Sequence, residues 1–313
     1  MHQKTKLIYN PFAGKGNAEK LLPKVQALLL ERNFDYDLVL TEGPGHANIL
    51  AQQFAREGCK LLVVAGGDGT VNEVINGLMQ SGTNGNGRPV MAVLPVGRGN
   101  DFSFGMDIPQ DLQQACDVLV QGKQRCIDVG HVAGGDYPQG RYFGNGVGLG
   151  FDTVVGFEAA KIKWLHGAAS YLVALIRTIF LFAHAPVFEV VTDDETIQQP
   201  FLMVSVMNGR RMGGSFHMAP EGNPGDGVFD LCLAGQVRQS RILPLALKFI
   251  SGTQKEHPAV RMVRSRQVTI RAIEGGIPAH ADGETICTAG TSLTIKIFPD
   301  ALEVISQNTG LPS

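Results

Sequence analysis

One aspartate, Asp68, lies inside a glycine-rich run that follows an apolar stretch of the sequence. The run LLVVAGGDGT covers residues 61–70, and the residues after it repeat apolar side chains at helical spacing. Glycines let backbone N–H groups approach a phosphate, and a helix N-terminus attracts an anion. A carboxylate beside phosphates is repelled unless a cation such as Mg²⁺ lies between them. The run therefore predicts a nucleotide-phosphate site with a metal ion; the alternative is a tight turn with a capping aspartate.

Two further glycine turns follow apolar runs in the same way. Residues 6–9 lead into NPFAGKGN at 10–17, and residues 89–95 lead into VGRGNDF at 96–102. Neither turn has the P-loop pattern or the dinucleotide fingerprint, so those two readings lose support. Ligands of open α/β sheets bind at the C-terminal ends of strands, which is where all three turns are expected.

The ordered motifs NPFAGKG, GGDGTVNEV and PVGRGNDF resemble the diacylglycerol kinase catalytic family, which includes bacterial soluble lipid kinases and eukaryotic sphingosine and ceramide kinases. Further matches follow in family order over nearly the whole chain: FGNGVGLGFD at 143–152, residues 219–227, and DGE at 282–284. The chain looks most like the bacterial members, because it has no extra regulatory domain. The resemblance implies an ATP- and Mg²⁺-dependent kinase of phospholipid metabolism, which transfers the γ-phosphate to a hydroxyl of a lipid such as diacylglycerol.

The resemblance also assigns roles to three carboxylates. Glu284 would be the base that accepts the proton of the lipid hydroxyl, Asp68 would lie at the metal–phosphate site, and Asp101 would join that acidic cluster. Local sequence alone favours a hairpin turn at 282–284, and it favours a surface or packing role for His280. The nucleotide contacts carried over by position are Asn10, Pro11, Phe12, Ala13, Gly14, Thr41, Gly66, Gly67, Asp68, Gly69, Thr70, Val71, Asn72, Gly97 and Arg98.

The chain departs from the family pattern at Arg98, where threonine is usual. An arginine at this position either binds phosphate at longer reach or turns to solvent, so the donor nucleotide is left open. We favour phosphate contact, because a glycine on either side frees the loop to turn the side chain inward.

A second metal site and a lipid contact are implied by the same resemblance. Asn223, Asp226 and Val228 would hold a structural Mg²⁺ through backbone oxygens and one carboxylate, and the alternative is an ordinary Asp-Gly turn. Asp152 would help to read the lipid head group, as its counterpart does in related sphingosine kinases.

The secondary-structure pattern of the sequence changes near residue 130. Strand and helix patterns alternate up to about residue 130, which predicts a doubly wound, mostly parallel sheet. The expected strands are 6–9, 36–40, 60–65, 90–94 and 125–129, and the expected helices are 18–32, 46–57, 71–79 and 110–121. Short β-rich runs then predict a sandwich, at 188–192, 201–208, 228–234, 268–272 and 293–298. The predicted fold class is α/β: a nucleotide-binding domain at 1–131, to which 299–313 return, and a β-rich lipid-substrate domain at 132–298, like NAD kinase and diacylglycerol kinase.

Composition is typical of a soluble globular protein. The 313 residues are 44% hydrophobic and 18% charged, and the net charge of −2 argues against nucleic acid as a partner. Five scattered cysteines without a CxxC pair indicate reduced thiols, and no signal peptide is visible, so we expect a cytoplasmic protein. The apolar run 168–185 is interrupted by Arg177 and predicts a buried or amphipathic helix rather than a membrane span. We expect a lipid substrate and peripheral contact with a membrane during turnover, and a homodimer is left open.

Three functions compete. The first is a lipid kinase, the second is an NAD kinase-like phosphotransferase, whose related fold also carries GGDGT, and the third is a non-catalytic nucleotide- or lipid-sensing protein. The NDF turn, the GFD run and the DGE motif favour the first, and the presence of both Asp68 and Glu284 argues against the third.

Overall fold

The computed structural model describes residues 5–82, 87–161, 173–174, 177–179 and 185–308. Most of the apolar run 168–185 lies outside these residues. Within the described part of the chain, no helix is long and apolar enough to cross a bilayer.

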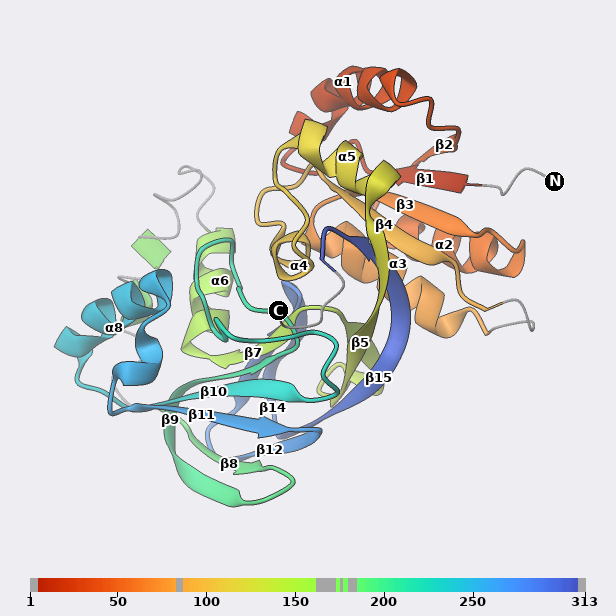
Figure 1. The fold of residues 1–313 in the computed structure, drawn as a ribbon. Helices are drawn as coiled ribbons and strands as arrows, with labels where there is room; N and C mark the ends of the chain where they lie inside the picture. Colours follow the sequence, from red (N-terminus) through yellow and green to blue (C-terminus); the bar gives the residue numbers. More distant parts are fainter. Residues whose placement is uncertain (1–4, 83–86, 162–172, 175–176, 180–184, 309–313) are drawn as a thin grey trace.

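The N-terminal part is a parallel sheet in the order β2-β1-β3-β4. Helices lie on both faces of the sheet, α1 and α5 on one and α2 and α3 on the other (Figure 1). The strands are β1 (Thr5–Tyr9), β2 (Asp37–Leu40), β3 (Leu61–Gly66) and β4 (Val90–Pro95). The helices are α1 (Asn17–Glu31), α2 (His46–Arg56), α3 (Asp68–Gln80), α4 (Asp101–Gly105) and α5 (Leu112–Gln121).

Helices α2 and α3 are joined by a carboxylate and by one close approach. The Glu73 carboxylate accepts hydrogen bonds from the backbone N–H groups of Gly45 (2.7 Å) and Ala47 (3.1 Å), which satisfies donors at the start of α2. A Cβ on Gly77 would lie 2.4 Å from the carbonyl oxygen of Asn48, so only glycine lets the two helices pack this closely. These contacts fix the helix that begins at Asp68.

The second part is a mainly antiparallel assembly with helices packed against it. Its strands are β5 (Lys123–Gly134), β6 (Tyr137–Phe143), β7 (Gly146–Gly150), β8 (Val187–Val191), β9 (Thr196–Met207), β10 (Phe229–Gly235), β11 (Val260–Ser265), β12 (Gln267–Glu274), β13 (Ile277–Ala281), β14 (Glu284–Gly290) and β15 (Ser292–Ser306). Its helices are α6 (Phe151–Lys161), α8 (Gln239–Ser251) and the short 3-10 helix η1 (Gln254–Glu256). The fold is thus the predicted α/β class: a doubly wound sheet with a β-sandwich-like second part.

One long strand belongs to both parts. β15 pairs with β12 at its start and with β4 at Val304, and it runs antiparallel to β5 along nearly its whole length. The predicted strand 293–298 is therefore only its first half. The register shifts between Phe298 and Leu302, and the Asp300 N–H donates to the Asp128 carboxylate at 3.0 Å. Pro299 thus lies at a bulge rather than at a strand end, and the predicted domain boundary at 131 lies within β5.

Candidate active site

Two of the predicted glycine turns touch each other. A Cβ on Gly97 would lie 2.3 Å from the Cα of Gly67, and a Cβ on Gly66 would lie 2.5 Å from the Cβ of Thr70. The turns follow the neighbouring strands β3 and β4, which pair from Leu61 to Gly66. Their close approach leaves backbone rather than side chains at the C-terminal edge of the sheet.

Asp68 is the first residue of α3 and faces the second turn. Its Oδ1 accepts a hydrogen bond from the Phe102 N–H at 3.1 Å. Burial, and secondly the nearby carboxylate of Asp101, raise the pKa of Asp68 to about 6. A buried carboxylate beside a second acid is stabilised in its charged form by a cation, and oxygen ligands suit Mg²⁺. The donor set therefore fits the divalent metal that the resemblance implies.

Asp101 is held by the loop between β9 and β10. Its carboxylate accepts hydrogen bonds from Arg211 Nε (2.8 Å) and from the Gly214 N–H (3.0 Å to either oxygen). Arg211 also donates to the carbonyl of Gly99 at 2.9 Å. The structure thus places Asp101 close to Asp68, as predicted, and pairs it with an arginine that sequence reasoning missed.

Asp282, the first residue of the DGE motif, joins its turn to α3 and to residues 144–146 by hydrogen bonds. It has the left-handed φ of 49°, and its carboxylate accepts hydrogen bonds from Asn72 Nδ2 (3.0 Å) and from three successive backbone N–H groups at 2.8–3.0 Å, those of Gly144, Asn145 and Gly146. The hairpin turn expected from local sequence is present, and its aspartate fixes the turn to the segment before β7.

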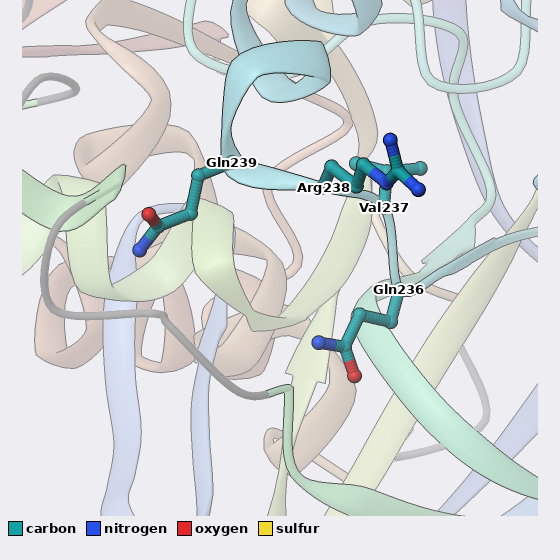
Figure 2. A pocket seen from close by; sticks show the side chains of 4 residues that line it. All are labelled: Gln236, Val237, Arg238 and Gln239. Atoms are coloured by element: carbon teal, nitrogen blue, oxygen red, sulfur yellow. The ribbon is translucent and has the colours of Figure 1, made fainter.

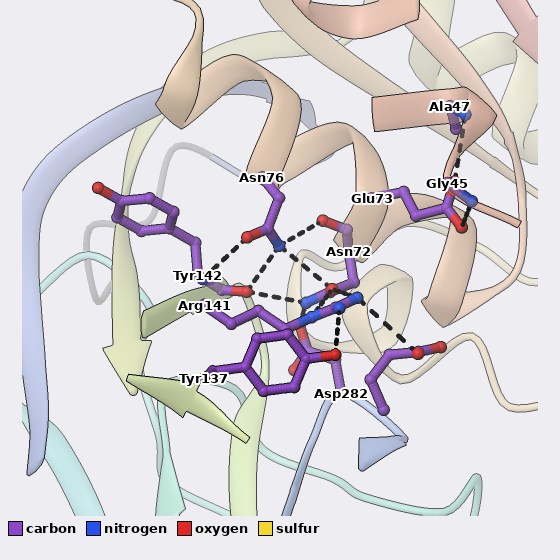
Figure 3. A network of polar contacts seen from close by, with 10 residues as sticks. Gly45, Ala47, Asn72, Glu73, Asn76, Tyr137, Arg141, Tyr142 and Asp282 are labelled. Carbon is purple, nitrogen blue, oxygen red and sulfur yellow. Dashed lines mark hydrogen bonds and ion pairs between the residues drawn. The ribbon is translucent and has the colours of Figure 1, made fainter. Parts of the chain in front are cut away.

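Asn72 connects α3 to both neighbouring segments of the second part (Figure 3). Its Oδ1 accepts hydrogen bonds from Arg141 Nε (3.0 Å) and Nη2 (2.7 Å), and its Nδ2 donates to the Tyr142 carbonyl (3.0 Å) and to Asp282. Asn76, one turn later, pairs with the backbone of Tyr142. The Asn72 side chain is buried among these protein partners, so its contact with a nucleotide stays a prediction.

Glu284 lies over the Asp68 turn. A Cβ on Gly69 would lie 3.4 Å from Glu284 Oε1, and Glu284 Oε2 is 3.9 Å from Arg141 Nη2. The Glu284 side chain is 47% exposed, whereas Arg141 is mostly buried. An exposed carboxylate beside a phosphate-type turn is open to a substrate hydroxyl.

The predicted nucleotide residues of the first turn lie beside the same edge. Asn10 Nδ2 donates to Thr70 Oγ1 at 2.8 Å, and Asn10 Oδ1 accepts from the Phe12 N–H at 2.9 Å. Thr41 is buried, and its Oγ1 has no hydrogen-bond partner among the described residues. An orphaned buried hydroxyl at this edge fits a site completed by a ligand. Arg98 is exposed.

The second metal site was predicted to use one carboxylate, that of Asp226, and backbone oxygens. The described residues contain no cluster of three or more His, Cys, Asp or Glu side chains that could hold a metal ion. Asp226 pairs with Arg264, and its Oδ1 accepts from the Val228 N–H at 3.3 Å. The ion pair with Arg264 competes with a metal for this carboxylate. A site built from Asp226 with the backbone of Asn223 and Val228 stays a prediction.

A second polar cluster was not expected from the sequence. His280 Nε2 lies 3.7 Å from Asp152 Oδ2, and Ser205 joins them because Gly148 pairs with His280 on one side and with Ser205 on the other. Both Asp152 oxygens, His280 Nδ1 and Ser205 Oγ are buried without hydrogen-bond partners among the described residues. A Cβ on Gly148 would lie 2.3 Å from Asp152 Oδ2. Strand register brings these residues together, and a single sequence does not reveal it.

The comparisons with known proteins agree with this arrangement. The diacylglycerol kinase catalytic domain matches residues 4–132, and the YegS C-terminal NAD kinase beta sandwich-like domain matches residues 145–306. A diacylglycerol kinase of Staphylococcus carnosus is 28% identical over 91% of this chain and 89% of its own length. The crystal structure of a putative diacylglycerol kinase from Bacillus anthracis has a TM-score of 0.78 at 23% identity, covering 99% of this chain and 97% of that one.

A yeast NADH kinase complexed with NADH shares the fold more distantly, with a TM-score of 0.51 at 12% identity over 98% of this chain and 84% of that one. The catalytic-domain match contains all three glycine turns, and the sandwich-domain match contains Glu284 and Asp282. The chain therefore belongs to the diacylglycerol kinase family, with a catalytic domain followed by an NAD kinase-like β-sandwich domain.

Proposed function

We propose that this protein is an ATP- and Mg²⁺-dependent lipid kinase that phosphorylates a hydroxyl of a lipid such as diacylglycerol. The observation that carries the proposal is the position of Glu284, whose exposed carboxylate lies against Gly69 in the Asp68 turn. Family membership supports a phosphotransferase, and a relative named diacylglycerol kinase covers most of the chain.

The nucleotide is proposed to bind along the glycine turns. Backbone N–H groups of the turns at 10–14, 66–70 and 97–99 bind the phosphates, and the Thr41 hydroxyl supplies a further contact. Asp68 would hold Mg²⁺, which would neutralise charge on the phosphate oxygens, and Asp101, ion-paired with Arg211, would lie beside that metal. Arg211 fixes Asp101, so the β9–β10 loop closes the same site.

Glu284 is proposed to accept the proton of the attacking hydroxyl. The lipid oxygen forms a bond to the γ-phosphorus as the bond from that phosphorus to the β–γ bridging oxygen breaks, and ADP leaves. Arg141 is fixed on Asn72 by two N–H groups, and it presents a positive charge 3.9 Å from Glu284 Oε2. Asp282 fixes the turn before Glu284.

The acceptor head group is proposed to enter beside Asp152, His280 and Ser205. Their polar atoms lack partners among the described residues, which is costly unless a ligand or water satisfies them. His280 belongs to the hairpin that carries Glu284, since Ala281 pairs with Glu284. A hydroxyl-bearing head group in this cluster would therefore contact the same hairpin that carries the base. We further propose a cytoplasmic protein that contacts the membrane peripherally.

An NAD kinase-like phosphotransferase is the second candidate, favoured by the shared fold of the yeast NADH kinase. One assay separates the two: the purified chain is incubated with Mg²⁺ and γ-labelled ATP, with a total lipid extract supplemented with diacylglycerol or with NAD. We expect the label to enter the lipid fraction. Label in NAD alone would replace the proposal with the second candidate, and no transfer to either would favour a sensing protein.

A further inference from the structure

The outer face of α8 carries a stripe of large apolar side chains. Leu243, Leu247 and Ile250 are 46%, 59% and 47% exposed, and steps of four and three residues place them on one side of a helix. The inner face is buried in a methionine-rich cluster, through Ile242, Leu245 and Phe249. α8 is therefore packed on one side and apolar on its free side, which marks an interaction surface.

The charged residues of α8 and of its N-cap are all positive. Residues 238–251 contain Arg238, Arg241 and Lys248 and no acidic residue. Lys248 lies 3.6 Å from Glu256, whereas Arg238 and Arg241 form no ion pair with a described residue. Arg238 also lines an open hollow of about 470 Å³ with its neighbours 236–239 (Figure 2). Two guanidinium groups without an ion-pair partner among the described residues thus lie at the N-terminal end of α8.

An apolar stripe on a helix that begins with two cations matches an anionic bilayer surface. Such helices lie in the interface, with the apolar side chains among the acyl groups and the basic side chains at the head groups. We propose that α8 is the docking surface through which this protein binds an anionic lipid bilayer. The proposal rests on the proposed function, because a lipid acceptor must be reached in a membrane.

The position of α8 agrees with this role. α8 and α6 lie near each other, away from the parallel sheet (Figure 1), and Phe151 of α6 belongs to the same buried cluster as Phe249 of α8. Asp152, in the proposed head-group cluster, follows Phe151 directly. Docking through α8 therefore brings the acceptor side of the molecule to the bilayer, while the nucleotide turns stay on the other side.

The test is co-sedimentation of the full chain with vesicles of phosphatidylglycerol and phosphatidylcholine. The double variant Leu243→Ser, Leu247→Ser should bind at least about tenfold more weakly, because it removes apolar burial. Arg241→Gln should lose about fivefold on anionic vesicles and nothing on pure phosphatidylcholine, since a basic residue near the surface contributes ~1 kcal/mol. Leu30→Ser on α1, where Leu30 is 77% exposed, and Arg266→Gln are matched controls that should bind like wild type. Thermal unfolding of each variant shows whether it is folded.

Wild-type binding by the folded double variant would overturn the proposal, and so would wild-type protein that fails to sediment with anionic vesicles. A dimer that the double variant converts to monomer, with vesicle binding unchanged, would assign α8 to contact between copies of the chain instead. Phosphorylation of a water-soluble, short-chain diacylglycerol keeps the two proposals separate. We expect wild-type rates from the double variant in that assay; failure of the wild type there refutes the proposed function and leaves the vesicle result standing.

Discussion

Neutralising Asp68 should make the metal-free protein more stable while it abolishes activity. The pKa of Asp68 is raised to about 6 by burial and by Asp101. An unfolded aspartate titrates near 3.9, so the difference of about two pKa units corresponds to about 3 kcal/mol. Because the folded-state pKa is the higher one, the unfolded chain loses its proton first. Stability without metal therefore falls between about pH 4 and pH 6, and the full cost remains above that window.

Asp68→Asn removes this titration and keeps an oxygen that accepts from the Phe102 N–H. We expect the metal-free variant to unfold with a free energy up to about 3 kcal/mol higher than that of wild type near neutral pH, and with little difference below about pH 4. Added Mg²⁺ should stabilise wild type more than the variant, because a ligand bound to the folded state adds stability by mass action. Turnover of the variant should be nearly absent.

The assay is urea unfolding in chelator across this pH range, with Asp194→Asn as the control, since Asp194 is exposed. At each pH, the free energy of unfolding of Asp194→Asn is subtracted from that of Asp68→Asn. The difference isolates the contribution of residue 68 from that of the other carboxylates. An Asp68→Asn protein that is less stable than wild type near neutral pH, or that keeps the wild-type pH dependence, would refute the reasoning. Wild-type turnover in the variant would remove Asp68 from the metal–phosphate site.

Three further substitutions test individual contacts. Arg141→Gln should lower the free energy of unfolding by about 1–3 kcal/mol, because Asn72 Oδ1 loses its charge-assisted bonds; urea unfolding checks this, and kcat should fall with little change in ATP affinity. Arg98→Thr should weaken ATP binding by about 1–3 kcal/mol at low salt and by less at high salt, and an unchanged affinity in a low-salt titration would show that Arg98 does not bind phosphate. Asp226→Ala should lower the melting temperature and remove its response to chelator if a structural metal binds there; melting that never responds to chelator, even in wild type, removes that site.

Alternation of apolar runs and glycine turns was enough to predict the parallel sheet. The run 61–66 is buried, and the chain must turn after it, so β3 and the following helix were predicted close to their observed positions. Strand β7 was missed because three of the five residues in its sequence, GVGLG, are glycines, which are depleted in strands. The second half of β15 was missed because Pro299 resembles a strand end, whereas the Asp128 carboxylate binds the bulge that lets the strand continue.

Some residues of the candidate site could also be predicted from the sequence, and others could not. Asp68 carries a local signal because it lies in a glycine turn after an apolar run, whereas Asp101 and Glu284 were assigned through the family resemblance. The structure brings all three to one edge. Arg211, Arg141 and the Asp152–His280 pair were not predicted in these contacts. Each of these contacts joins segments that are distant in sequence and that meet through strand register or loop closure. Neither strand register nor loop closure leaves a pattern in a single sequence.

Transfer of label from γ-labelled ATP to diacylglycerol, by wild type and by Glu284→Gln, tests the central claim most directly. The control is Glu274→Gln, at an exposed glutamate on β12. We expect wild type and Glu274→Gln to form labelled phosphatidic acid at equal rates. Glu284→Gln should lose at least about a hundredfold in kcat, the scale of general-base catalysis, while ATP affinity is retained. Full turnover by Glu284→Gln, or lost ATP affinity with kcat unchanged, would contradict the assignment of Glu284 as the base.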